Sequence, residues 1–292
     1  VNNVNNTGFN EPINFAGDKR IFVADDFYDV NHPVRRALLR NYIRMCLDEL
    51  SNYENVVHLI SQEYTGPLHF VQFWLDVIQE WQTETGKNPL IALSCTKNVQ
   101  DAILKDPVRS KLVDIIDIRY WHYKDDETIY APEGGKNLAP RQHARLEKVG
   151  RVTFAEAYKA VKEYRDLFPD KAVTYYAQNY PEMNWAVFMA GGSCPSIPVK
   201  DIDFLTDAAQ MTITNVNNSE YYSIENTEKG IIFFTTSKFK SSFSLPKGKY
   251  EIRTFDTKNG QQMNKTVQIN CKGNYLPLVN SDTAMIWWFK KL

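Results

Sequence analysis

The chain has 292 residues, which is enough for one large domain and a small one. Hydrophobic residues make up 43% of it and charged residues 24%, which is ordinary for a globular protein. The formal net charge of -1 argues against nucleic acid or an anionic membrane surface as the main partner.

Helices and short apolar strands alternate along the first two thirds of the chain. The later helices include one that Thr153 and Glu156 begin as a capping box. Continuous apolar strands that alternate with helices indicate a parallel sheet covered on both faces. No glycine-rich nucleotide loop follows a strand, so the pattern favours a (β/α) barrel. The expected strands cover residues 56–60, 89–95, 113–118 and 172–177, and the expected helices cover residues 34–50, 67–82, 99–104, 153–168 and 185–190.

A long connection runs from residue 120 to residue 152 and contains several Gly and Pro residues. Connections of that length in compact domains are usually functional or disordered. Because the loops that follow the strands of a barrel build its active site, this connection is expected to border the site.

The pattern changes from about residue 213, where helical periodicity gives way to short alternating runs separated by turns. Such runs predict an antiparallel β domain, most simply a sandwich. We expect the boundary within residues 200–212 and assign residues 1–205 to the barrel and residues 206–292 to an accessory β-sandwich. The predicted fold class is α/β, a partial (β/α)8 barrel followed by an all-β domain.

Glu63 is the first catalytic candidate. It follows the strand over residues 56–60 within three residues. Leu59, Ser61 and Glu63 share strand parity, so Glu63 continues the row of side chains that point into the barrel if the strand stays regular. A glycosidase needs a carboxyl group that is protonated when the bond breaks, because the leaving oxygen must receive a proton. The alternative interpretation is a surface glutamate at the end of a strand.

Polar and aromatic side chains also follow the later strands, at the same end of the sheet. Arginine supplies donors for a hydroxyl or a carboxylate, and an aromatic ring stacks on a sugar. The 16 Tyr, 16 Phe and 6 Trp residues suit either aromatic-lined clefts or a large aromatic core, and Trp121 fits both readings equally well. The candidate substrate-binding residues are Gln62, Lys97, Arg119, Tyr120, Trp121, His122, Arg141, His143, Gln178 and Asn179.

The sequence gives little support for a metal site, a cofactor or a nucleophilic serine. The five His residues show no HxH or HExxH spacing, the four Cys residues show no CxxC spacing, and no GxSxG motif is present. We therefore expect no metal and no cofactor. No apolar run approaches the roughly 18–20 residues needed to span a bilayer, so no membrane span is expected.

Several segments resemble known glycoside hydrolases. Residues 55–66, NVVHLISQEYTG, are similar to the fourth-strand signature of retaining (β/α)8 glycoside hydrolases, whose strand ends in the acid/base Glu. Residues 29–33, 137–143 and 185–193 resemble segments of large glycoside hydrolases common in gut Bacteroidetes. The related apiosidase-like hydrolases have a helix like the last of these segments after strand seven. They close with a small β domain of the collagen-binding type, which residues 213–292 resemble.

The chain departs from this family pattern at two positions. Many of these enzymes have Asn directly before the acid/base, where this chain has Gln62, whose amide can still donate to a sugar hydroxyl. The resemblance implies a nucleophilic Glu at the end of strand seven, but residues 174–179 offer no carboxylate there and Glu182 comes a few residues later. The second carboxylate could also lie outside this chain or be missing. The ranked candidates within the chain are Glu182, then Asp25 and Asp26, then Asp125, Asp126 and Glu127.

The resemblance covers nearly the whole chain and places strands four to eight within residues 55–200. Strands one to three are absent, so we expect a longer protein to supply the missing N-terminal barrel segment. The resemblance also implies a periplasmic, extracellular or cell-surface location.

Three functions stay open. The first is a glycoside hydrolase with a polysaccharide-derived carbohydrate as its substrate. The second is a non-catalytic glycan-binding protein on a degenerate hydrolase barrel that has lost its nucleophile. The third is binding of a protein or matrix partner by the β domain. Exposed aromatic residues on one face of that domain would favour this function.

Overall fold

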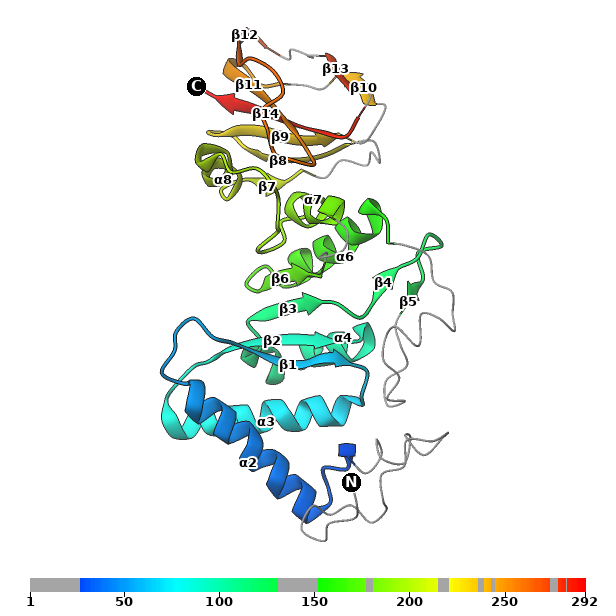
Figure 1. Cartoon of the computed structure of the whole chain (residues 1–292), viewed down its shortest axis with the longest axis vertical. Coiled ribbons are helices and arrows are strands. Elements are labelled where there is room, and N and C mark those ends of the chain that lie inside the picture. Colours follow the sequence, from blue (N-terminus) through cyan, green and yellow to red (C-terminus); the bar gives the residue numbers. More distant parts are fainter. Residues whose placement is uncertain are drawn as a thin grey trace. The chain divides into compact units, whose positions relative to one another are not determined.

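The chain divides into two compact units (Figure 1). The first comprises Val1–Val152 and Phe168–Tyr176, and the second comprises Thr153–Leu167 and Ala177–Leu292. The computed structural model describes residues 27–130, 152–176, 181–214, 221–235, 239–242, 245–273, 278–281 and 283–292, and within these it describes the backbone alone at residues 61–63, 181, 239–242 and 278–281.

A four-stranded parallel sheet lies in the first unit (Figure 1). All three neighbouring pairs are parallel, which confirms the arrangement that the alternation of strands and helices predicts. Within the described part of the chain, β1 and β6 form the two edges of this sheet. In spatial order the strands are β1 (Val57–Tyr64), β2 (Leu90–Cys95), β3 (Ile115–Ile118) and β6 (Ala172–Tyr175).

The helices of this unit are α2 (Pro33–Leu50), α3 (Leu68–Thr85) and α4 (Lys97–Lys105), with a short 3-10 helix η1 (Arg109–Leu112). The α3 helix is amphipathic and buries Trp81, whose indole Nε1 donates a hydrogen bond to Asp48 on α2 at 2.7 Å. It ends at Gly86, which takes the left-handed conformation that favours glycine, with φ of 71°.

Part of the long connection predicted between residues 120 and 152 forms a small hairpin. Its strands are β4 (His122–Tyr123) and β5 (Ile129–Tyr130), which pair antiparallel. Two-residue strands leave too short an apolar run to be recognised from periodicity, which explains why the sequence predicts only a loop here.

The second unit combines three helices with an antiparallel sheet of six strands (Figure 1). The capping box predicted at Thr153 is present: its backbone N–H donates to the Glu156 carboxylate at 2.6 Å, and Thr153 Oγ1 accepts from the Glu156 N–H at 3.3 Å. The helices are α6 (Phe154–Leu167), α7 (Pro181–Met189) and α8 (Ile202–Ala208). The sheet contains, in spatial order, β12 (Val267–Cys271), β11 (Gly248–Asp256), β14 (Met285–Lys291), β9 (Gly230–Thr235), β8 (Tyr221–Asn226) and β7 (Thr212–Ile213).

Both faces of the six-stranded sheet are covered. On one face Trp288 packs with Trp185 of α7 and Phe204 of α8 in a single apolar cluster. On the other face Phe289 packs in a second cluster with Leu245 and Cys271. In the described part of the chain, two further strands, β10 (Phe239–Ser242) and β13 (Leu278–Ser281), form a separate two-stranded antiparallel sheet.

The helices α6 and α7 thus pack in one unit with the β-sheet, although the sequence assigns them to the barrel. A helix that belongs to a barrel by sequence order can still pack on a neighbouring domain. The boundary between residues 205 and 206 therefore stays a prediction, as does the sandwich architecture.

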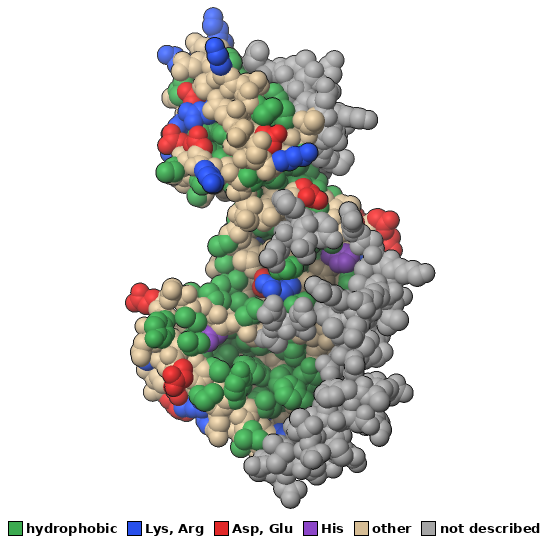
Figure 2. All heavy atoms as spheres, in the orientation of Figure 1, with side chains coloured by type: hydrophobic (Ala, Val, Ile, Leu, Met, Phe, Trp, Pro, Cys, Tyr) green, Lys and Arg blue, Asp and Glu red, His purple; other side chains and the backbone are tan. Residues whose placement is uncertain are grey.

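The first unit exposes apolar side chains over α2, in the region where Figure 2 shows hydrophobic residues gathered on its surface. Val34, Leu38, Tyr42 and Met45 recur there at helical spacing, and each is more than one third exposed. The edge strand β1 also exposes Val57. Separately, none of the helices in the described residues combines the length and the apolar character that a membrane span requires.

Candidate functional site

The carboxyl ends of the four parallel strands bring several predicted site residues to one edge of the sheet (Figure 1). Glu63 directly precedes the last residue of β1, Lys97 follows β2, and Arg119 follows β3. Tyr176 directly follows β6. This gathering is expected from the sequence, because neighbouring parallel strands end at the same edge of a sheet.

The two faces of this sheet differ in polarity. Tyr64, which pairs with Cys95, stacks on Phe70 of α3 at 6.2 Å between ring centroids, so its face of the sheet is covered by that helix. Alternate residues occupy the opposite face. This opposite face, which we call the polar face, carries Ser94, Asp117 and Thr174.

Asp117 lies at the centre of the polar face and is buried. Its Oδ2 accepts a hydrogen bond from Arg119 Nε at 2.9 Å, and its Oδ1 accepts one from Thr174 Oγ1 at 2.8 Å. The Arg119 guanidinium lies 4.8 Å from the centroid of the Tyr176 ring. Burial alone would lower the pKa of Arg119, but the charge and the hydrogen bond of Asp117 outweigh it and raise that pKa.

Arg119 was predicted from the sequence, but Asp117 was not. A signal was present: Asp117 is a carboxylate inside a strand otherwise made of Ile residues. Lys, Glu, Arg and Asp side chains are rarely buried unless they are paired, so a charged residue in a buried strand indicates a partner.

Lys97 and Trp121 form a second, more tightly packed cluster. The Lys97 ammonium lies 3.0 Å from Asp101 and 4.8 Å from the centroid of the Trp121 ring. The Trp121 indole donates to Gln100 Oε1 at 2.9 Å, and Gln100 in turn donates to the carbonyl of Leu93 at 2.9 Å. This network anchors α4 to the sheet.

Tyr120 and Trp121 are therefore largely inaccessible to a ligand, at 6% and 2% exposed. Of the two interpretations of Trp121, the core residue fits its burial better. His122 lies on β4 and is half-buried, with its ring 4.9 Å from the ring of Tyr130. The substrate-binding role of these three residues stays a prediction.

The backbone of β1 is irregular beside Glu63. Ile60 pairs with Leu93 and Tyr64 pairs with Cys95, so β1 advances four positions where β2 advances two. The condition under which Glu63 continues the inward-facing row, a regular strand, is thus not met. Bulges of this kind are common next to active sites because they re-aim a side chain. The side chains of Gln62 and Glu63 lie outside the described residues, and the catalytic role of Glu63 stays a prediction.

The remaining candidates fall in three places. Glu182 is exposed in the first turn of α7, in the second unit. Asp126 lies in the turn between β4 and β5, where Thr128 donates to its carboxylate at 2.5 Å from the hydroxyl and 2.9 Å from the backbone. The predicted residues outside the described part of the chain are Asp25, Asp26, Arg141, His143, Gln178 and Asn179.

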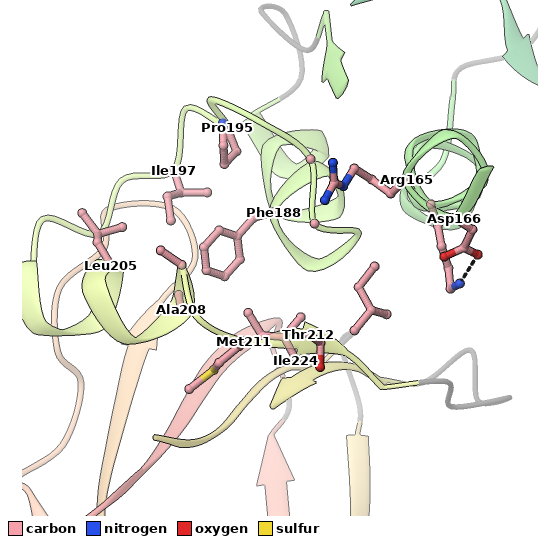
Figure 3. Close-up of a pocket in the computed structure, with 15 residues that line it drawn as sticks. Arg165, Asp166, Phe188, Pro195, Ile197, Leu205, Ala208, Met211, Thr212 and Ile224 are labelled. Carbon is pink, nitrogen blue, oxygen red and sulfur yellow. Dashed lines mark hydrogen bonds and ion pairs between the residues drawn. The ribbon is translucent and has the colours of Figure 1, made fainter. Parts of the chain in front are cut away.

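The second unit contains a cavity of about 620 Å³ (Figure 3). Figure 3 shows the ring of Phe188 within it, with Arg165 and Asp166 of α6 on one side and Met211 and Ile224 on the other. None of the predicted site residues lines it. Among its described lining residues Asp166 is the one carboxylate, and it forms an ion pair with Lys162, so the lining offers no pair of carboxylates for glycoside hydrolysis.

The residues that the structure describes include no group of three or more His, Cys, Asp or Glu side chains placed to hold a metal ion. Cys95 is buried as a free thiol, and burial raises its pKa. A buried thiol of this kind packs as a small apolar side chain.

A family model described as a domain of unknown function, DUF6298, matches residues 1–211. The chain belongs to the DUF6298 family. No curated protein matches it in sequence. The family description names no activity. Solved structures that are similar to this DUF6298 chain give a further comparison.

A glycoside hydrolase family 5 structure from Bacteroides vulgatus ATCC 8482 is similar, with a TM-score of 0.53 and 9% identity over 86% of this chain. The chain spans 66% of the length of that structure. A glycoside hydrolase family 44 xyloglucanase from Paenibacillus polymyxa matches with a TM-score of 0.42 and 10% identity, and the match covers 86% of this chain and 70% of the xyloglucanase chain. The Clostridium thermocellum endoglucanase Cel44A, also of family 44, has a TM-score of 0.37, 11% identity, and coverage of 91% and 61%.

The first of these matches supports a glycoside hydrolase-like fold for the DUF6298 chain. At 9% identity the likeness concerns the fold and not the reaction. It agrees with the parallel sheet predicted from the sequence, and it leaves the apiosidase-like and collagen-binding assignments as expectations.

Proposed function

We propose that the protein is a glycoside hydrolase that cleaves a polysaccharide-derived glycosidic bond, with Glu63 as the general acid. The observation that carries the proposal is the gathering of Glu63, Lys97 and Arg119 at the carboxyl edge of a parallel sheet. In barrel enzymes the residues that bind and transform the substrate lie at this edge.

Glu63 suits the general acid because of its position in the strand. It lies near the end of β1, next to the irregular pairing between Ile60 and Tyr64. A carboxyl group there would protonate the leaving oxygen of the glycosidic bond. The similarity of residues 55–66 to the acid/base strand of retaining glycoside hydrolases supports the same role.

The second carboxylate remains the open element of this mechanism. Glu182 ranks first, ahead of the early acids Asp25 and Asp26 and the acids of the β4–β5 turn. We do not assign the nucleophile to Asp117, because it is buried and its carboxylate holds Arg119 and Thr174 by hydrogen bonds. A retaining reaction would place the two carboxyl groups about 5–5.5 Å apart, and an inverting one about 6.5–9.5 Å.

The test is the Glu63→Gln variant of the full-length protein, assayed for reducing ends released from oligosaccharides of plant and host polysaccharides. Loss of a general acid lowers the rate about 10²–10⁴-fold. Glu54→Gln is the matched control, because Glu54 is an exposed residue in the turn before β1 and should leave the rate unchanged. A Glu63→Gln protein as active as the wild type would contradict the proposal.

A non-catalytic glycan-binding protein is the second candidate function. Asp117, an acidic side chain on the polar face, accepts hydrogen bonds from Arg119 and Thr174. This structural use of the carboxylate favours a binding role over a catalytic one. A wild-type protein that binds oligosaccharides without cleaving any of them would support this alternative.

The proposal also includes the parts of the protein beyond the described sheet. Exposed apolar side chains on α2 and at the β1 edge support further barrel elements that cover this side, from a preceding N-terminal segment. An apiosidase-like substrate range and a periplasmic, extracellular or cell-surface location complete the proposal and rest on the resemblance alone. Localisation by cell fractionation tests the last of these.

A further inference from the structure

Arg119 is held in one orientation by three neighbours. Asp117 accepts from its Nε, and that carboxylate is itself fixed by the hydroxyl of Thr174. The guanidinium carbon lies over the Tyr176 ring, 4.8 Å from the centroid. Asp117 is almost fully buried, with a side chain 8% exposed, so the carboxylate cannot follow the guanidinium into solvent. Arg119 is therefore ordered before any ligand binds.

The same contacts leave the outer edge of the guanidinium available. Arg119 bonds Asp117 through Nε, and the other two nitrogens, which carry four N–H groups, bond to no other described residue. The side chain of Arg119 is 22% exposed, so part of it is open to solvent. Two parallel N–H groups at the end of a guanidinium match the two oxygens of a carboxylate.

A sugar ring would find an apolar surface beside that edge. Tyr176 is 44% exposed, although Arg119 lies against its ring. A uronic acid can make both contacts, because its carboxylate is attached directly to the pyranose ring. The ring can stack on an aromatic side chain while the carboxylate forms a bidentate ion pair with an arginine.

We infer that the glycosyl unit bound at the carboxyl ends of β3 and β6 is a uronic acid, with Arg119 binding its carboxylate and Tyr176 its ring. The inference rests on the proposed function, because it names the substrate class of the same edge of the sheet. Asp117 and Thr174 act as positioning residues that hold Arg119.

The experiment measures equilibrium binding by calorimetry with the full-length protein. The probes are oligosaccharides of galacturonic or glucuronic acid and the same oligosaccharides after reduction of each carboxylate to an alcohol. A charge-assisted bidentate contact should make the wild type bind at least one uronate probe about 10- to 100-fold more tightly than its reduced form. This preference should shrink as salt is added.

Three variants assign the preference to Arg119. Arg119→Gln should lose the preference while keeping its affinity for the reduced probe, and Arg119→Lys should lose most of it, because an ammonium is a point charge without the fork. Arg36→Gln is the control: its guanidinium also lies over an aromatic ring, that of Phe73 at 4.9 Å, but on α2. It should keep the full preference.

The inference is overturned if the wild type binds every uronate probe no more tightly than its reduced form. It is also overturned if Arg119→Lys keeps the full preference, or if Arg119→Gln weakens both forms equally. Binding preference and hydrolysis are separate readouts, so a uronate preference that survives while Glu63→Gln proves harmless sinks the hydrolase proposal and leaves this inference standing.

Discussion

Asp117 shows how a buried charge can orient a site residue two positions along the chain. Its two oxygens each accept one hydrogen bond, from Thr174 and from Arg119. Removing the carboxylate leaves both donors without their acceptor in a buried place, and unsatisfied buried groups are costly.

Asp117→Ala should lower the free energy of unfolding by about 1–3 kcal/mol, measured by urea denaturation. Asp170→Ala is the control in the same unit, because Asp170 is 76% exposed and lies 3.7 Å from Lys171. A surface ion pair of that kind contributes about 0–1 kcal/mol. Equal effects of the two substitutions would show that the buried hydrogen bonds of Asp117 do not stabilise the unit more than a surface ion pair does.

At this scale the sequence singles out residues that follow apolar runs and misses those inside them. Glu63 and Arg119 were proposed because each comes just after the end of an apolar run. Asp117 was missed because it is counted as part of the run. The burial of Trp121 depends on Gln100, which α4 brings near it from 21 positions away in the chain, and no local pattern encodes that contact.

Among the elements, β1 combines the edge of the sheet with the irregular backbone at Glu63. Periodicity predicted its first half, but the strand continues to Tyr64, so Glu63 lies within it. Similarly, α4 begins at Lys97 and α7 at Pro181, before the apolar positions from which each helix was inferred. Polar first turns carry little periodic signal, which is why helix starts are hard to place.

His58 makes β1 sensitive to pH. Burial lowers the pKa of His58 below its ordinary value of 6.5. The unfolded chain therefore binds this proton more readily, so the contribution of neutral His58 to stability is present above about pH 6.5 and is lost as the pH falls through the folded-state pKa.

The melting temperature should therefore fall between about pH 7.5 and about pH 5.5, and His58→Gln should reduce that fall. Hydrogen bonds from Arg35 to Asp29 and from Arg44 to Glu84 lower the pKa values of those two carboxyl groups, so they titrate below this window. Differential scanning calorimetry across the range measures the slope. A His58→Gln protein with the slope of the wild type would show that another group is responsible.

At the scale of the whole molecule, the second unit joins helices and sheet through one apolar cluster. Trp185 of α7 is 1% exposed, and its indole donates to the carbonyl of Thr257 at 2.8 Å. The sequence predicted the helix and the strands separately, but the contact between them depends on residues 72 positions apart in the chain.

Trp185→Ala should therefore destabilise the unit by about 3–5 kcal/mol in chemical denaturation. Ile202→Ala, at a position 77% exposed on α8, should change stability by no more than about 0.5 kcal/mol. If Trp185→Ala were as mild as the control, α7 would not be part of a cooperative unit with the sheet.

The central claim, that Glu63 is a general acid, is tested most directly by varying the leaving group. A dinitrophenyl leaving group departs without a proton, whereas the alcohol of a natural glycoside requires one. For glycosides of a sugar that the wild type hydrolyses, Glu63→Gln should lower kcat/KM about 10²–10⁴-fold with the natural leaving group and less than about tenfold with dinitrophenolate. Equal losses on both substrates, or no loss on either, would contradict the assignment of Glu63.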